Sequence, residues 1–294
     1  MTGRGAGGGA GKQPRLLIMT ADDVGMTAGV CRAVARAHRG GIVTSASVLA
    51  VGRAFPDAAR LARSAPTLGI GAHLAMVGED PPLLSAREIP TLVDRRGRLP
   101  LSYRTVVGRG LARRIDPADV RREFGAQLER IAGIGVPVTH VDTHQHVHLW
   151  PAVAEVVVEL ARGHGVPAVR LPRSARRSPV GVGVNVLSRR LDTRISLAGL
   201  VATGDYAGLD EAGALDRSLP GALARLAARG EASVEVNAHP GEPADPDLRR
   251  FAWGYRWSAE LAMLLDPATR RLVAEYGFRL GSYADLARAA TEPT

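Results

Sequence analysis

The chain has 294 residues, of which 46% are hydrophobic, and this length suits one α/β domain with a large core. Its formal net charge of +9 favours nucleic acids, anionic membrane surfaces or acidic substrates as partners. Aromatic residues make up only 4%, and there is no zinc-finger, RNA-recognition or clear helix-turn-helix signature, which argues against a nucleic-acid partner. A single cysteine, Cys31, excludes an intrachain disulfide, and we expect it in the core.

Residues 1–13 are rich in glycine, and we expect a flexible tail there, followed by a single domain over residues 14–290. The tail lacks the apolar stretch of a signal peptide. No later run approaches the ~18 consecutive apolar residues that indicate a membrane span. We therefore expect a cytoplasmic protein.

The domain begins with an apolar segment, Leu16–Met19, that leads to the acids Asp22 and Asp23. It predicts a buried strand whose carboxyl end, where parallel α/β folds build their sites, carries both carboxylates. Adjacent carboxylates on a strand face different ways, so one can bind a metal while the other accepts a proton. The alternative is that Asp23 or Thr27 only caps the helix expected over residues 28–38.

Two further apolar segments contain one histidine each. Residues 68–74 hold His73, and residues 233–239 end at His239, which Pro-Gly follows. A lone histidine in such a segment is more often structural than catalytic. If the strands are parallel neighbours, however, both histidines converge with the acids at one mouth.

Residues 140–148 contain four of the eight histidines and one aspartate, namely His140, Asp142, His144, His146 and His148. Imidazole and carboxylate are the usual ligands of a borderline divalent metal, so the cluster predicts a metal site. If the whole run were extended, alternation would place all five side chains on one face. The alternative is a solvated edge strand with singly hydrogen-bonded histidines.

Two long segments, residues 83–114 and 172–220, are predicted to be excursions over the mouth of the site. Arg170 and Arg173 follow a strand expected at residues 168–171, and they are candidates for substrate contacts or for surface ion pairs. Arginines concentrate near both segments, which favours contact with a membrane surface or, alternatively, solvated surface charge.

Several short elements, in fixed order and spacing, resemble the YdjC-like carbohydrate deacetylases, which include proteins of the ChbG and HpnK types. The elements are Ala21–Gly25, Gly40–Ser47, Gly71–Leu74, His140–His148 and Ala238–Gly241. The resemblance covers about residues 15–288, and residues 251–261 are most similar to the hopanoid-associated HpnK branch. It implies an α/β fold of the modified (β/α) TIM-like barrel type, one divalent metal ion, and removal of an N-acetyl group from an amino sugar.

Carried over residue by residue, the resemblance implies that Asp23, His73 and His144 bind the metal. Asp22 then resembles the general base, and His239 the residue that acts on the leaving group. One carboxylate and two imidazoles suit Zn²⁺ and, with added waters, Mg²⁺, Mn²⁺ or Co²⁺. The expected substrate is a carbohydrate or a glycolipid, with an N-acetylglucosaminyl hopanoid as one candidate, and the family implies a homodimer.

The remaining polar residues of the cluster have open roles. Asp142 could orient a ligand imidazole through its second nitrogen. We expect His140, His146 and His148 to support the ligands, to contact substrate or to be structural, because a site with four histidines would close the metal. Two other functions use similar residues: a metal-dependent phosphoesterase, and a sugar-binding protein without catalysis.

Overall fold

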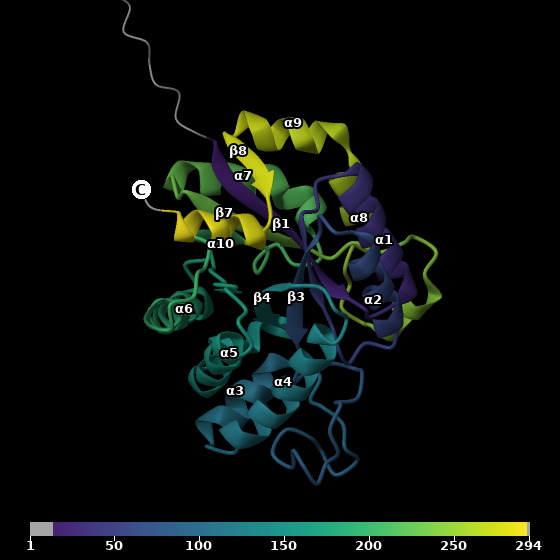
Figure 1. Ribbon diagram of the computed structural model, residues 1–294, viewed down its shortest axis with the longest axis vertical. Coiled ribbons are helices and arrows are strands. Elements are labelled where there is room, and N and C mark those ends of the chain that lie inside the picture. Colours follow the sequence, from purple (N-terminus) through teal and green to yellow (C-terminus); the bar gives the residue numbers. More distant parts are fainter. Residues whose placement is uncertain (1–13, 293–294) are drawn as a thin grey trace, which may run out of the picture.

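The computed structural model describes residues 14–292, which form one parallel sheet surrounded by helices (Figure 1). The strands are β1 (Arg15–Val24), β2 (Ser45–Val48), β3 (Gly69–Leu74), β4 (Val138–Thr143), β5 (Ala168–Val169), β6 (Asp205–Ala207), β7 (Ser233–Ala238) and β8 (Phe278–Gly281). Their order is β5-β4-β3-β2-β1-β7-β6, and β8 pairs with the first half of β1.

The sheet curls into a barrel that one irregular segment closes. Val201 forms a parallel bridge with Ala168 of β5, and four residues later the same segment enters β6, which pairs with β7. Residues 201–207 therefore connect the two edges of the sheet. This arrangement confirms the expected α/β fold of the modified (β/α) TIM-like barrel type.

Helices follow most of the strands and cover the outside of the barrel, with α1, α2 and α8 on one side and α3 to α6 on another (Figure 1). The α-helices are α1 (Ala28–Gly40), α2 (Phe55–Ser64), α3 (Tyr103–Leu111), α4 (Pro117–Ala132), α5 (Pro151–Gly163), α6 (Pro179–Leu197), α7 (Leu215–Arg229), α8 (Trp257–Leu265), α9 (Pro267–Glu275) and α10 (Tyr283–Thr291). Two 3₁₀ turns, η1 (His144–Leu149) and η2 (Pro246–Arg250), complete the elements. None of the helices in residues 14–292 combines the length and the apolar character needed to cross a membrane.

The two faces of β1 separate an apolar core from a layered barrel interior. Leu17 and Met19 belong to the large core that strands and helices share. Leu16 and Ile18 point the other way and pack against Tyr283 of α10, which makes an apolar layer at the bottom of the barrel. Alternation along β1 then places Thr20 and Asp22 above this layer. The interior thus changes from apolar to polar toward the carboxyl ends of the strands.

Local sequence explains the ends of the elements. Thr27 caps α1, since its hydroxyl accepts a hydrogen bond from the Val30 amide, which leaves Asp23 free of that role. The helix covers residues 28–40, close to the expected 28–38. Cys31 is buried on α1, as expected.

The segment 172–220 does border the mouth of the pocket, but its interpretation as a loop is wrong for much of its length. The 19-residue helix α6 occupies residues 179–197, and α7 begins at Leu215. Ser178 caps α6 and Pro179 occupies its first turn, a common start signal, but Gly181 and Gly183 weaken the helical pattern. Residues 83–114 are mostly irregular and contain the short helix α3. The expectation for residues 1–13 lies outside the described residues.

Candidate active site

Five side chains named from the sequence meet at the carboxyl end of the barrel. Asp22 and Asp23 lie near the end of β1, His73 near the end of β3, and His144 and His239 directly after β4 and β7. All five line one pocket of about 1000 Å³. The parallel sheet brings them together because the carboxyl ends of its strands share one edge.

Asp23 lies at the centre of this group in a strained backbone conformation, with φ at 61°. Its Oδ1 atom is 3.0 Å from Nδ1 of His144 and 3.4 Å from Nε2 of His73. Neither approach is aligned as a hydrogen bond, so both carboxylate oxygens are buried without a donor. A buried carboxylate without donors is costly unless a cation satisfies it. The three residues therefore fit a divalent metal ion, with ligand atoms within 4.8 Å of one another.

Charge at this point of the pocket also favours a cation. Burial disfavours the charged Asp23 carboxylate, but the imidazoles of His144 and His73 hold its pKa well below the usual range. Burial also disfavours the His73 imidazolium, yet Asp142 and the neighbouring acids outweigh it and raise the pKa of His73 to about 10. The surroundings thus stabilise a positive charge at this position, and a metal ion would compete with the His73 proton for the imidazole nitrogen.

Asp142 orients His73 as expected from its position in the sequence. Its Oδ1 atom lies 2.9 Å from Nδ1 of His73, which turns Nε2 toward Asp23. Ser47 donates a second hydrogen bond to the same carboxylate at 3.0 Å. Asp142, Asp22 and His73 also form a compact group of their own. Both of those carboxylates, however, already bind Arg170, so this group fits a metal less well.

Arg170 is a fully buried cation in the barrel interior, at 0% exposure. Its guanidinium contacts both oxygens of Asp22 at 2.7 and 2.8 Å, Oε1 of Glu235 at 2.9 Å, and Asp142. It is therefore neither a surface ion pair nor a substrate contact, because acidic side chains from β1, β4 and β7 surround it. Arg173, by contrast, forms a loose ion pair near the surface with Asp192, at 3.7 Å.

Asp22 is held from two sides while it still lines the pocket. Besides Arg170, the side-chain amide of Asn237 donates to its Oδ2 atom at 2.7 Å. The hydroxyl of Tyr206 donates in turn to Asn237 at 2.6 Å. These contacts fix the carboxylate and keep it separate from Asp23.

Sequence reasoning missed Asn237, Glu235 and Tyr206. A signal for the first two was present, since residues 233, 235 and 237 share one face of β7 and are all polar, whereas residues 234, 236 and 238 between them are apolar. Tyr206 had no comparable signal, because β6 has only three residues.

The other three histidines of the cluster do not share one face, so the extended arrangement considered for residues 140–148 is wrong. Strand β4 ends at Thr143, and η1 turns the chain with Gln145 and His146 in the left-handed region, at φ values of 53° and 54°. Of the three, His146 alone lines the pocket, and its Nε2 atom is 3.3 Å from the Tyr206 hydroxyl. Burial lowers its pKa well below the usual range.

His140 and His148 are buried below the pocket. His140 stacks on Tyr283 with ring centroids 4.0 Å apart, and Gly71 of β3 leaves the room, since a Cβ there would lie 2.2 Å from the ring. His148 bridges the Thr143 hydroxyl at 2.6 Å and the Arg170 carbonyl at 3.0 Å. Burial lowers the pKa of His140 to about 3 and that of His148 to about 4, so both are neutral supports.

His239 lines the pocket from the segment after β7. Its backbone N–H donates to the buried Glu260 carboxylate at 2.6 Å, which fixes the turn. Its ring packs edge-on against Tyr255, with centroids 4.8 Å apart. The ring centroid of Trp253, in the same segment, lies 5.2 Å from that of His144. These aromatic side chains give the pocket a face of the kind that sugar rings stack on.

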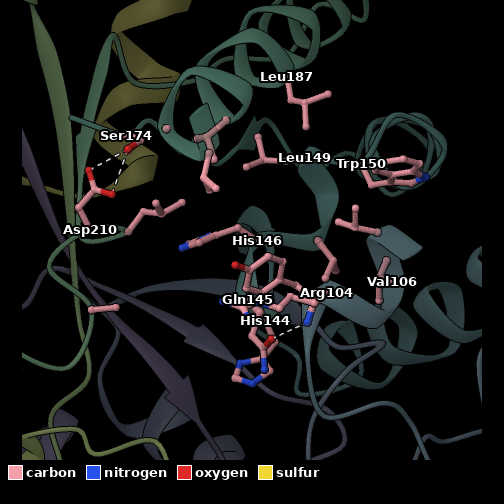
Figure 2. Close-up of a pocket in the computed structure, with 18 of the residues that line it drawn as sticks. Arg104, Val106, His144, Gln145, His146, Leu149, Trp150, Ser174, Leu187 and Asp210 are labelled. Carbon is pink, nitrogen blue, oxygen red and sulfur yellow. Dashed lines mark hydrogen bonds between the residues drawn. The ribbon is translucent and has the colours of Figure 1, made fainter. Parts of the chain in front are cut away.

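The outer part of the pocket is an apolar wall. Figure 2 shows Leu149, Trp150 and Leu187 above His144 and His146, and Val106 to their right. They come from three elements, α3, the end of η1 with its following residue, and α6. The site therefore combines a charged floor with a wall suited to apolar groups.

Comparison with known proteins gives a consistent result over most of the chain. The family model described as YdjC-like protein matches residues 16–275. A carbohydrate deacetylase of Geobacillus stearothermophilus is 33% identical, with 92% of this chain and 98% of that protein covered. A chitooligosaccharide deacetylase of Enterobacter sp. (strain 638) is 32% identical, with coverage of 92% and 99%.

Two further matches differ in extent. A carbohydrate deacetylase of Brevibacillus brevis is 39% identical over 156 residues, which span 53% of this chain and 59% of that relative. A crystal structure of an Enterococcus faecalis V583 protein, provisionally described as a cellobiose-phosphate cleavage protein, superposes with a TM-score of 0.76 at 25% identity. It covers 93% of this chain and 99% of that one.

Proposed function

Because this chain belongs to the YdjC-like family, we propose that it is a metal-dependent carbohydrate deacetylase that removes an N-acetyl group from an amino sugar. The observation that carries the proposal is the donorless Asp23 carboxylate between His73 and His144, in the same pocket as Asp22 and His239. Relatives described as carbohydrate and chitooligosaccharide deacetylases support the substrate class.

In this proposal Asp23, His73 and His144 hold one divalent ion, either Zn²⁺ or Mg²⁺. When bound, such an ion supplies Lewis-acid polarisation of the acetyl carbonyl and makes a neighbouring water more acidic. Three protein ligands leave coordination positions open, as a catalytic rather than a structural site requires. Asp142 keeps His73 in the orientation that presents Nε2.

The protein residues perform the proton transfers. Asp22 accepts a proton from the water whose oxygen bonds to the acetyl carbon, and Arg170 with Asn237 fixes the carboxylate for this task. His239 donates a proton to the sugar nitrogen as the C–N bond breaks, so acetate and a free amine leave. Each transfer contributes about 10²- to 10⁴-fold to the rate.

The apolar wall supports a glycolipid as the finer substrate assignment, with an N-acetylglucosaminyl hopanoid as the candidate. Val106, Leu149 and Leu187 offer apolar surface beyond the space around the charged floor. A chitooligosaccharide, which carries polar hydroxyl and acetamido groups along its length, makes less use of such a wall. A homodimer and a cytoplasmic location belong to the same proposal.

The test is acetate release from diacetylchitobiose and from an N-acetylglucosaminyl hopanoid, by the protein loaded with Zn²⁺ or Mg²⁺, with and without chelator. Chelator-sensitive acetate is the expected result, with the hopanoid preferred. Failure with both substrates while metal is bound would overturn the proposal, and phosphate release from an aryl phosphate would then favour a phosphoesterase.

The matched variant is Asp22→Asn, which keeps the shape of the side chain. It should retain bound metal and fold, as measured by elemental analysis and circular dichroism, while turnover falls at least 10²-fold. Unchanged turnover would remove Asp22 from its role as the base.

A further inference from the structure

The net charge of the protein is concentrated in two short segments. Residues 101–114 contain four arginines and no acidic residue, and residues 173–198 contain six arginines and one aspartate. These segments account for the whole formal excess of +9, and acidic and basic residues balance in the rest of the chain. Charge gathered in this way is not a general surface property of an arginine-rich protein.

The same two segments carry the exposed apolar side chains. Among residues 14–292, every large hydrophobic side chain that is exposed lies in one of them: Leu101, Tyr103, Val107, Leu111, Val180, Val182, Val186 and Leu197. Leu197 is 83% exposed and Leu111 is 73% exposed. Tyr103, Val107 and Leu111 are four residues apart on α3 and make one stripe. On α6, Val182, Val186 and Leu197 share a face with Arg189.

Both segments border the mouth of the pocket. Tyr103, Arg104 and Val107 of α3 line it, as do Val180 and Val184 of α6. Figure 2 places Arg104 and Val106 on one side of the pocket and Leu187 on another, with Leu149 and Trp150 between them. We call residues 101–114 and 173–198 the rim.

We propose that the rim docks on the surface of an anionic lipid bilayer, so that the mouth of the pocket faces the lipid. Arginine side chains bind lipid phosphates and acidic head groups, while valine and leucine enter the interface beside them. A second copy of the chain fits this face poorly, because a two-fold contact would set the arginines of one rim against those of the other. The inference rests on the proposed function only in its consequence, which is that the acetylated sugar is taken from a membrane-resident glycolipid.

The test is flotation of the purified full-length protein with vesicles of phosphatidylcholine alone or with one third phosphatidylglycerol. We expect co-flotation with the anionic vesicles, at least tenfold less with the neutral ones, and loss at high salt. Absence of co-flotation with the anionic vesicles at low salt would overturn the inference.

Substitutions in the rim and elsewhere test which residues contact the vesicles. Arg189→Ala with Arg190→Ala should weaken binding to anionic vesicles about 25-fold, at about fivefold for each arginine near the surface. Leu111→Glu with Leu197→Glu should abolish it. The control pair Arg39→Ala with Arg63→Ala removes the same charge from the exposed surfaces of α1 and α2 and should change binding less than threefold. An equal loss in the control pair would overturn the assignment to the rim.

The outcome is independent of deacetylation. None of the substituted residues lines the pocket, so all of these variants should release acetate from diacetylchitobiose, without vesicles, at the wild-type rate. Vesicle binding without any acetate release would leave the rim in place and overturn only the proposed function. If sedimentation instead shows that Leu111→Glu with Leu197→Glu converts a dimer to a monomer while vesicle binding persists, the rim is an interface between copies and the inference is wrong.

Discussion

The floor and the wall of the pocket are built in opposite ways. On the floor the charged groups around the donorless Asp23 carboxylate have several partners: Arg170 alone contacts three carboxylates, and Asp22 accepts from two side chains. The wall, by contrast, is apolar, and the helices α3 and α6 that contribute to it also expose leucines and valines. The difference indicates that the floor is fixed to preserve one chemical geometry, whereas the wall can change with the substrate at small cost to the fold.

The largest effect is expected when one histidine is removed from the floor. His144→Ala should lose the bound metal and reduce acetate release to the level of the chelated protein, because Asp23 and His73 alone hold a metal weakly. His148→Ala, four residues later, is the control and should retain the metal, since its ring is buried below the pocket. Elemental analysis of the folded proteins decides, and equal metal content in the two variants would contradict the proposed ligand set.

The second test concerns the leaving group. His239→Gln should lower kcat about 10²- to 10⁴-fold and leave metal content unchanged, because the side chain supplies a proton rather than a ligand. A substrate with a good leaving group, such as an acetylated aryl amine bearing nitro groups, should recover most of the loss. Steady-state rates on both substrates measure this, and an equal deficit on each would argue against proton donation.

The third test separates two arginines that are close in sequence. Arg170→Met should lower the free energy of unfolding by about 3–5 kcal/mol, because it leaves the buried carboxylates of Asp22, Asp142 and Glu235 without their cation. Arg173→Met removes one loose pair near the surface and should cost less than about 1 kcal/mol. Urea denaturation measures both. Similar costs for the two variants would mean that the floor tolerates change as well as the wall does.

The smallest effect is expected on the wall. Leu187→Ala should raise KM for a glycolipid about fivefold to tenfold, through lost apolar contact, and leave kcat unchanged. With diacetylchitobiose neither constant should change. Kinetics on the two substrates measure the contrast, and a fall in kcat on both would show that the wall also positions the reacting group.

Much of the floor was predictable because its charged and polar residues lie at the ends of strands. Asp22, Asp23, His73 and His239 each lie near the end of an apolar segment, and parallel pairing brings such positions together. His144 was found from the cluster of histidines instead. The barrel type came from the resemblance to the YdjC-like family.

The rest depends on contacts that no local pattern specifies. Arginine is usually exposed, and no local pattern marks Arg170 as buried. It is buried because β1, β4 and β7 each place one acidic side chain against its guanidinium. The turn η1 redirects His146 and His148 after a strand-like alternation. Helix α6 was missed because its two glycines weaken the helical signal, although Ser178 and Pro179 mark its start.

Because β1 pairs with strands from the end of the chain, it cannot complete its pairing until those strands have been synthesised. The strand that carries Asp22 and Asp23 lies between β2 and β7, and its first half also pairs with β8, so two of its partners are translated more than 200 residues after it. At about 5–20 residues per second, the ribosome exposes an incomplete sheet edge for roughly 10 s or longer. Asn237 and Tyr283, which secure the acids and seal the base of the barrel, arrive only then. The first residues of the active site to be synthesised thus depend for their contacts on some of the last.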